Sequence, residues 1–113
     1  MASAVAGGTL VLEKPFLARG RELGEIGYNF AKLDGWEYLE AMDADPANKD
    51  MFRISQKQAF GLFAKAAKKE TPDIDEIDLR QRMGVGDIMN AVRVGTAFFI
   101  VTSRAANRRI KDV

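Results

Sequence analysis

Apolar and polar residues alternate along the first part of the chain, from Thr9 to Ala18. This period of two, in residues that suit a pleated surface, is typical of a β-strand with one buried face. Leu10 and Leu12 are expected on that face. Because Pro15 has no N–H to give to a neighbouring strand, the strand is predicted to lie at a sheet edge or to end near this residue.

A glycine turn and a second, weaker extended run follow the first strand. Arg19–Gly20 supplies the turn, and the run RELGEIGYNF at 21–30 carries Leu23, Ile26, Tyr28 and Phe30 as its apolar residues. Two extended runs around such a turn indicate a β-hairpin, here over residues 9–30. An isolated hairpin is marginally stable in water, so it is expected to pack against helices.

The next segment, DGWEYLEAM, has the spacing of a helix. Asp34 and Glu37 are placed as a capping box at its start. The helix is predicted over about residues 34–44, because the residue before Pro46 disfavours helical backbone. Its apolar stripe is expected to be Trp36, Leu39 and Met42.

A stronger helical pattern occupies residues 55–69, after the polar loop ADPANKD. Ser55 is expected to cap this helix, with Gln58 at the reciprocal position. The wide apolar face has helical spacing and consists of Ala59, Phe60, Leu62, Phe63, Ala64, Ala66 and Ala67. A shorter helix is predicted over about 74–82, with acids in its first turn and arginines at its end.

The stretch MGVGDIMNAVRVGTAFFIV at 83–101 allows three interpretations: a phosphate-binding loop, a membrane-spanning segment, or the most buried helix of a small domain. A phosphate loop needs more glycines and usually a lysine, and Asp87 would repel the anion. A spanning helix needs ~20 predominantly apolar residues, whereas this run is shorter and Asn90 and Arg93 interrupt it. We therefore predict a buried central helix over about 86–106, capped by Asp87, with Gly95 in close contact with another element.

Composition narrows the choice of function. The 113 residues predict one domain, at 9–107, after a flexible lead-in at 1–8 and before a basic tail at 108–113. The formal net charge is only +1, which argues against a strong nucleic-acid binder. The chain has no cysteine and no histidine, so the commonest general base and the commonest metal ligands are missing. No secretory signal pattern precedes the first strand, and a cytoplasmic location is expected.

Two groups of acidic residues are candidates for metal or acid–base sites. Asp43, Asp45, Asn48 and Asp50 lack the glycine and glutamate of an EF-hand loop. Asp73, Asp75, Glu76 and Asp78 lie where a helix start favours acids, and their side chains are not expected to converge. We therefore expect no catalytic residue, metal site or cofactor, and a non-enzymatic α+β domain with an N-terminal hairpin on a bundle of three to four helices.

The order of these features resembles the tail assembly chaperones of long-tailed bacteriophages and prophages, from about Leu10 to Arg104. The features that carry the resemblance are Glu13–Lys14–Pro15, Gly20, Ile26 to Phe30, Leu33–Asp34–Gly35, FAKAAK at 63–68, Asp78–Leu79, and the capped helix from Asp87 to Phe99. The resemblance implies a small cytoplasmic protein of virion morphogenesis that binds the tape measure protein. Tail tube subunits and further copies of the chain are additional partners that it implies.

A helix-in-groove contact would suit a helical client. The residues expected to supply its apolar surface are Phe60, Phe63, Phe98, Phe99 and Trp36, although each of them is also a natural core residue. The alternative function is a small nucleic-acid-binding or regulatory protein that uses the basic C-terminal end, Arg108, Arg109 and Lys111. Binding to nucleic acid should weaken steeply with salt.

Overall fold

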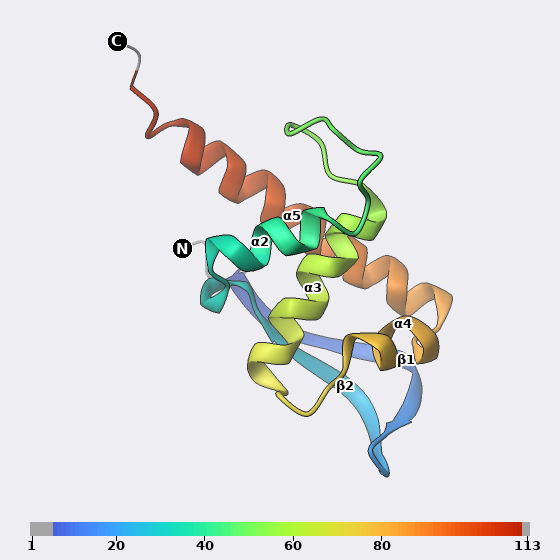
Figure 1. Ribbon diagram of the computed structural model, residues 1–113. Helices are drawn as coiled ribbons and strands as arrows, with labels where there is room; N and C mark the ends of the chain where they lie inside the picture. The colour runs from blue at the N-terminus through green and yellow to red at the C-terminus, as the bar shows by residue number, and fades with distance from the viewer. Residues whose placement is uncertain (1–5, 112–113) are drawn as a thin grey trace.

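The computed structural model describes residues 6–111, in which a hairpin is followed by a set of helices (Figure 1). The strands are β1 (Gly7–Ala18) and β2 (Arg21–Asn29), and the 3-10 turn η1 (Phe30–Lys32) follows them. The α-helices are α2 (Gly35–Met42), α3 (Gln56–Glu70), α4 (Glu76–Arg82) and α5 (Val85–Asn107). The predicted α+β architecture, a hairpin packed on helices, is confirmed.

The hairpin has a two-residue turn at its tip. Ala18 pairs with Arg21, and both residues between them have positive φ, 52° at Arg19 and 80° at Gly20. Positive φ at both positions defines the type I′ turn, whose twist matches that of the flanking strands. The turn predicted at Arg19–Gly20 is therefore confirmed.

Strand β1 begins two residues before the predicted start, at Gly7. Gly8 pairs with Tyr28, and a Cβ added to Gly8 would lie 3.0 Å from the Tyr28 hydroxyl oxygen. The strand therefore passes close to the tyrosine ring, and its pairing with Tyr28 places Gly8 in the sheet and not in a lead-in. Residues 1–5 of the predicted lead-in and residues 112–113 of the predicted tail lie outside the described residues.

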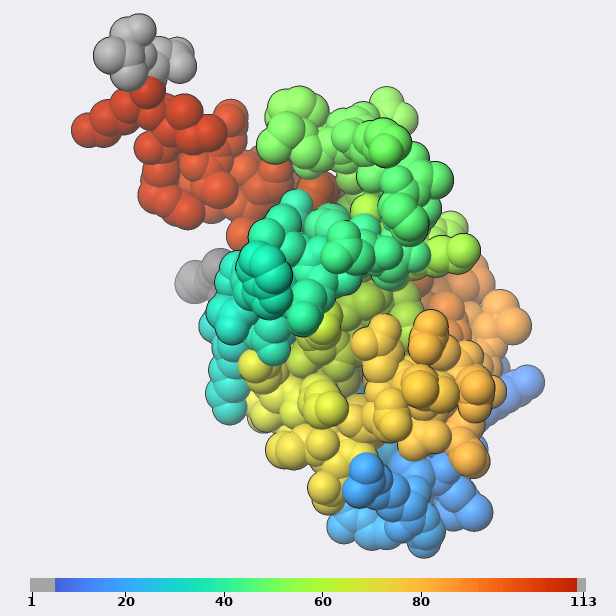
Figure 2. Space-filling model, viewed as in Figure 1, coloured from blue at the N-terminus to red at the C-terminus, as the bar shows by residue number. Residues whose placement is uncertain are grey.

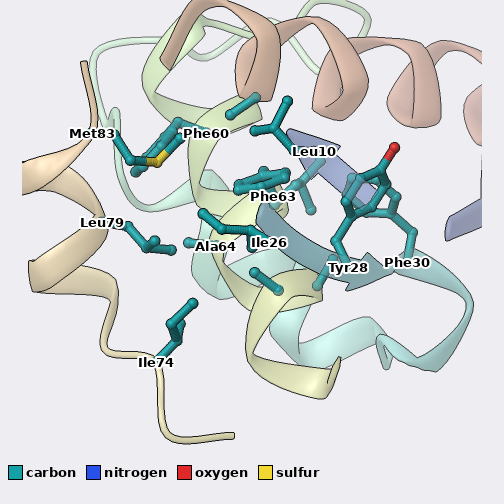
Figure 3. Close-up of a cluster of buried hydrophobic side chains, with 14 of the residues drawn as sticks. Leu10, Ile26, Tyr28, Phe30, Phe60, Phe63, Ala64, Ile74, Leu79 and Met83 are labelled. Atoms are coloured by element: carbon teal, nitrogen blue, oxygen red, sulfur yellow. The ribbon is translucent and has the colours of Figure 1, made fainter. Parts of the chain in front are cut away.

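Helix α3 is the central element of the fold. It contacts β2 and η1 on one side and α2, α4 and α5 on the others. The whole predicted apolar face of α3 is buried, and Leu62 and Phe63 are fully inaccessible to solvent. Figure 3 shows how this face meets the hairpin and α4, through Leu10, Ile26, Tyr28, Phe30, Ile74, Leu79 and Met83.

Helix α5 is peripheral, so its prediction as the buried central helix is wrong. Only a narrow stripe of α5 is fully buried, formed by Asp87, Ala91, Gly95 and Phe99. The polar residues Asn90 and Arg93 turn to solvent, and the helix extends beyond the body of the molecule (Figure 1). The close contact expected at Gly95 is confirmed, because a Cβ there would lie 2.3 Å from the carbonyl oxygen of Ala59 in α3.

Helix α2 packs through a stripe that shares only Met42 with the predicted one. Trp36 is 70% exposed and Leu39 is 50% exposed, whereas Ala41 is buried and Tyr38 packs against the core beside Met42. The small Ala41 lies against Gly61 of α3, and this close approach sets which face of α2 turns inward. Both predicted capping boxes are confirmed, Asp34 with Glu37 and Ser55 with Gln58.

Asp87 does not cap α5, contrary to the prediction. The N-cap is Gly84, and the Asp87 carboxylate turns to β1, where it accepts hydrogen bonds from the N–H groups of Glu13 (2.8 Å) and Lys14 (3.1 Å). The register of the hairpin shifts between Val11 and Phe16, so the stretch that contains Glu13 and Lys14 bulges from the ladder. The Asp87 carboxylate therefore supplies the hydrogen-bond acceptors that β2 does not offer to Glu13 and Lys14. These bonds attach α5 to the hairpin.

Candidate functional site

An apolar groove of about 560 Å³ opens between the C-terminal part of α5 and the loop that joins α2 to α3. Figure 2 shows these two segments standing apart above the body of the molecule. The groove is lined by Tyr38, Met51, Phe52, Leu62, Phe98, Phe99, Thr102, Ser103, Arg104, Ala106, Asn107 and Ile110. Arg104 is the one charged residue among these lining residues.

The base of the groove is rigid. Phe99 and Leu62 are buried and belong to the helix packing described above. The Phe98 ring stacks on Phe30, with ring centroids 4.5 Å apart and planes inclined by 10°. The aromatic surface at the base therefore has a fixed orientation before any partner arrives.

The walls of the groove expose large apolar side chains to water. Phe52 is 79% exposed, Met51 is 74% exposed and Ile110 is 69% exposed. Single exposed apolar residues are common, but three of them around one apolar groove are typical of an interaction surface. Water gains freedom when such a surface is covered, so binding of an apolar partner is favourable here.

The loop that carries Met51 and Phe52 is held by its own hydrogen bonds. The Asn48 carboxamide donates to the Arg53 carbonyl oxygen (3.2 Å) and accepts from the Asp50 N–H (3.1 Å). The Asp50 carboxylate in turn accepts from the Phe52 N–H (2.8 Å). These bonds fix the backbone that presents the two apolar side chains.

Gln58 connects this loop to both neighbouring helices. Its Oε1 accepts from Asn48 Nδ2 (2.7 Å) and from the Ser55 N–H (2.9 Å), and its Nε2 donates to the Met42 carbonyl oxygen (3.0 Å). The side chain is buried, and a buried amide with three partners is well satisfied. Gln58 was predicted only as half of a capping box, so its role in ordering the loop is an addition from the structure.

Positive charge surrounds the C-terminal end of the groove. From Ile88 to Lys111 the sequence carries five cationic residues and no acid. Arg109 donates to the Ala105 carbonyl oxygen, one of the carbonyl groups in the last turn of α5. Within residues 6–111, no ion pair joins Arg104, Arg108 or Lys111 to an acid, in contrast to Lys32, Lys65 and Lys69, which are all paired.

The five predicted partner-binding residues lie in different parts of the structure, and only two of them line the groove. Phe98 and Phe99 line the groove, whereas Phe63 is fully buried and Phe60, although mostly buried, lines a separate hollow beside Ile88 and Val92. Trp36 is exposed on α2 and does not line the groove.

Sequence reasoning missed Met51, Phe52 and Ile110 as groove residues. The available signal was an apolar pair, Met51–Phe52, between the charged residues Asp50 and Arg53 of a polar loop.

The acidic clusters serve local structure. The Asp75 carboxylate accepts from the Ile77 N–H at the start of α4, and Asp78 pairs with Arg82 one turn later (3.4 Å). Among residues 6–111, no group of three or more acids is arranged to hold a metal ion.

The glycines at the start of α5 make room for β1. A Cβ on Gly84 would lie 2.9 Å from the Lys14 side chain, and one on Gly86 would lie 3.1 Å from the Glu13 carboxylate. The backbone there is packed against the hairpin and the adjacent Asp87 is already bonded to it. The segment therefore has no open cradle for a phosphate.

Helix α5 is long and apolar enough, by length and composition, to cross a membrane. Over its most apolar 18 residues the mean hydropathy is 1.3, and 22% of these residues are buried. The sequence argument that this run is too short to span is therefore wrong, since α5 has 23 residues. Core helices of soluble proteins meet the same criterion, and Asp87 and Gly95 join one face of α5 to β1 and α3.

Three comparisons with known proteins gave no match: no family model, no curated protein and no solved structure matches the chain. The function is therefore argued from the groove and from the residues that carry the resemblance to tail assembly chaperones.

Proposed function

We propose that the chain is a tail assembly chaperone of a long-tailed phage or prophage, a non-enzymatic protein that binds the tape measure protein in the host cytoplasm during tail morphogenesis. Tail tube subunits and further copies of the chain are additional partners under this proposal. The resemblance described above supports it, and the groove supplies a surface suited to the task.

The observation that carries the proposal is the ordered loop that exposes Met51 and Phe52 beside α5. The flexible methionine side chain adapts to varied apolar partners and phenylalanine adds a large apolar area, which suits a protein that holds a long client. Because the client leaves once assembly proceeds, the chaperone needs a binding surface that stays folded when the client is absent. The fixed stacking of Phe98 on Phe30 and the bonded loop meet that need.

The direct test is co-expression with the tape measure protein encoded beside this chain. We expect the two to co-purify, and the tape measure protein to be less soluble when expressed alone. Phe52→Asp should abolish co-purification, because it places a charge on the apolar wall. Val85→Asp is the matched control, since Val85 is 78% exposed at the start of α5 and does not line the groove. Loss of binding in both variants, or in neither, would contradict the proposed surface.

Trp36 is a second candidate contact that this test separates. Trp36→Asp changes an exposed side chain of α2 outside the groove. Retained co-purification would assign the client to the groove alone. Loss of co-purification with an unchanged unfolding midpoint would extend the binding surface to α2.

Nucleic-acid binding is the alternative function, and it is favoured by Arg104, Arg108 and Lys111, which pair with no acid among residues 6–111. Retention of DNA or RNA through purification, weakening steeply with added salt, would support it. Arg108→Ala should then reduce the retention and leave the tape measure protein unaffected. No acid lies between Ile88 and Lys111 to oppose a phosphate backbone.

A further inference from the structure

We propose that the groove binds an amphipathic α-helix whose apolar stripe is flanked by acidic residues. The inference deepens the proposed function and rests on it only for the identity of the protein that supplies the helix. It adds the charge of the bound segment, and it argues the helical conformation, expected above for a helical client, from the groove itself.

The helical conformation follows from the backbone around the groove. Its base and one wall come from α2, α3 and α5, whose interior N–H and C=O groups are bonded within each helix. An extended peptide would leave its own backbone groups unpaired against these apolar side chains, at a cost of about 1–3 kcal/mol for each buried group. A helix satisfies its backbone internally and presents only side chains, so it is the conformation that the groove accepts.

The acidic flanks follow from the charge around the groove. Arg104 lines it, Arg108 lies one helical turn further along the chain, and Lys111 follows Ile110, another lining residue. The dipole of α5 favours cations at this end, but Arg109 already donates to a terminal carbonyl. Three cations without an acidic partner among residues 6–111 thus remain beside an apolar surface. Carboxylates on the two edges of a docked helix would complement them.

The open shape of the groove distinguishes this partner from a lipid surface. The hollow is lined by Phe52 from the α2–α3 loop, by Phe98 from α5 and by Ile110 from the chain just after α5. A flat bilayer would touch the two rims and leave the base uncovered, whereas a cylinder fills the hollow. A second copy of this chain would have to offer its own acidic segment, 73–78, where Ile77 is 49% exposed.

The test uses three fluorescein-labelled 18-residue peptides with the same leucine stripe at helical spacing. They differ only in the flanking residues, which are glutamate, glutamine or lysine. We expect the glutamate peptide to bind the intact protein at least tenfold more tightly than the lysine peptide, with the glutamine peptide between them. Added salt should reduce this difference, because the flanks are exposed to solvent.

Two paired variants separate the apolar and charged contributions. Phe52→Ser should weaken the binding of all three peptides by a similar factor. Arg104→Glu combined with Arg108→Glu should reverse the order of the peptides. The matched control is Arg19→Glu with Arg21→Glu, which makes the same change in net charge at the tip of the hairpin, far from the groove (Figure 1).

Each outcome decides between the proposals. Equal binding of the three peptides, or binding of none, overturns the acidic-helix inference, and the chaperone proposal stands if the tape measure protein still co-purifies in a Phe52-dependent manner. Binding of the glutamate peptide without any co-purification of the tape measure protein supports the acidic-helix inference and overturns the chaperone proposal. Tighter binding to phosphatidylglycerol vesicles or to a DNA oligonucleotide than to the glutamate peptide overturns the inference. So does self-association of the free chain that is lost in Phe52→Asp, since a second copy would then fill the groove.

Discussion

The two halves of α5 have different surroundings although they form one continuous helix. The N-terminal half is attached to the rest of the molecule through Asp87, which binds β1, and through Gly95, which lies against Ala59. The C-terminal half extends past the body and contributes Thr102, Ala106 and nearby residues to the groove (Figure 1). At about 1.5 Å per residue, the helix is about 34 Å long, enough for both roles.

This division separates stability from binding along a single element. Residues that hold α5 in place are buried and small or hydrogen-bonded, and a partner cannot reach them. Residues that form the outer walls of the groove, such as Phe52 and Ile110, are exposed and contribute little to packing. Substitutions in the first half should therefore change the free energy of unfolding, and substitutions around the second half should change only binding.

Among substitutions in α5, Asp87→Ala is expected to have the largest effect on stability. The change removes two hydrogen bonds to a buried carboxylate and leaves the Glu13 and Lys14 N–H groups without that acceptor. We expect a loss of about 3 kcal/mol in the free energy of unfolding, measured by urea denaturation. Asp87→Asn keeps one acceptor oxygen and should lose less. A change below about 1 kcal/mol for Asp87→Ala would show that the attachment lies elsewhere.

Gly95→Ala is expected to have the next largest effect. Alanine normally favours a helix over glycine by about 1 kcal/mol, but the added methyl group would meet a backbone carbonyl oxygen, so we expect a net loss of about 2 kcal/mol. Gly35→Ala is the control, because Gly35 is also helical and nothing lies within 4 Å of an added Cβ. That variant should be neutral or slightly stabilised. Equal behaviour of the two variants would contradict the close contact of α5 with α3.

These first two residues show what the sequence could and could not predict. The hairpin, its turn and the helices follow from local patterns, and Gly95 was recognised as a close contact because an interior glycine disfavours a helix. Asp87 was mistaken for a cap, since an acid near a helix start is usually one. Its actual partners lie 73 and 74 residues away, and local spacing carries no information on them.

The groove could not be predicted for a similar reason. Its base came partly from residues that sequence reasoning did single out, Phe98 and Phe99. Its exposed wall came from Met51 and Phe52, which have no periodic pattern because they lie in a loop. In the sequence pattern, Phe60 and Phe63 were as good candidates for partner binding as Phe98 and Phe99. Only the packing of α3 at the centre of the fold shows that they are core residues.

Glu37→Gln should have a small, pH-dependent effect. The hydrogen bond from Lys69 lowers the pKa of Glu37, with a further contribution from the Asp34 N–H of the capping box. A lowered pKa in the folded state means that the ionised side chain stabilises the fold above the ordinary pKa of glutamate. This contribution disappears as the pH falls through the folded-state value.

We expect Glu37→Gln to be less stable than the parent protein by about 0.5 kcal/mol at pH 7, and this difference should shrink steadily as the pH is lowered. Thermal unfolding at a series of pH values from neutral to acid measures the difference. A difference that does not depend on pH cannot come from the charge of Glu37.

Phe52→Ser completes the comparison with an expected change in unfolding free energy within about 0.5 kcal/mol. Phe52 is 79% exposed, so the folded state loses little packing when the ring is removed. Phe63→Ser is the contrast, because that ring is fully buried and its loss should unfold the protein or cost about 3 kcal/mol or more. A large loss of stability in Phe52→Ser would mean that the loop is part of the core.

Gln58 links the end of α2, the Met51–Phe52 loop and the first turn of α3 through one buried amide. If that amide loses one of its partners, the others are weakened at the same time, so the three segments should open to solvent as a unit. The protection of their backbone amide protons against deuterium exchange should then give one common free energy of opening. A helix seated against Phe52 should slow that exchange even at the start of α3, in a part of the chain that the helix itself does not touch.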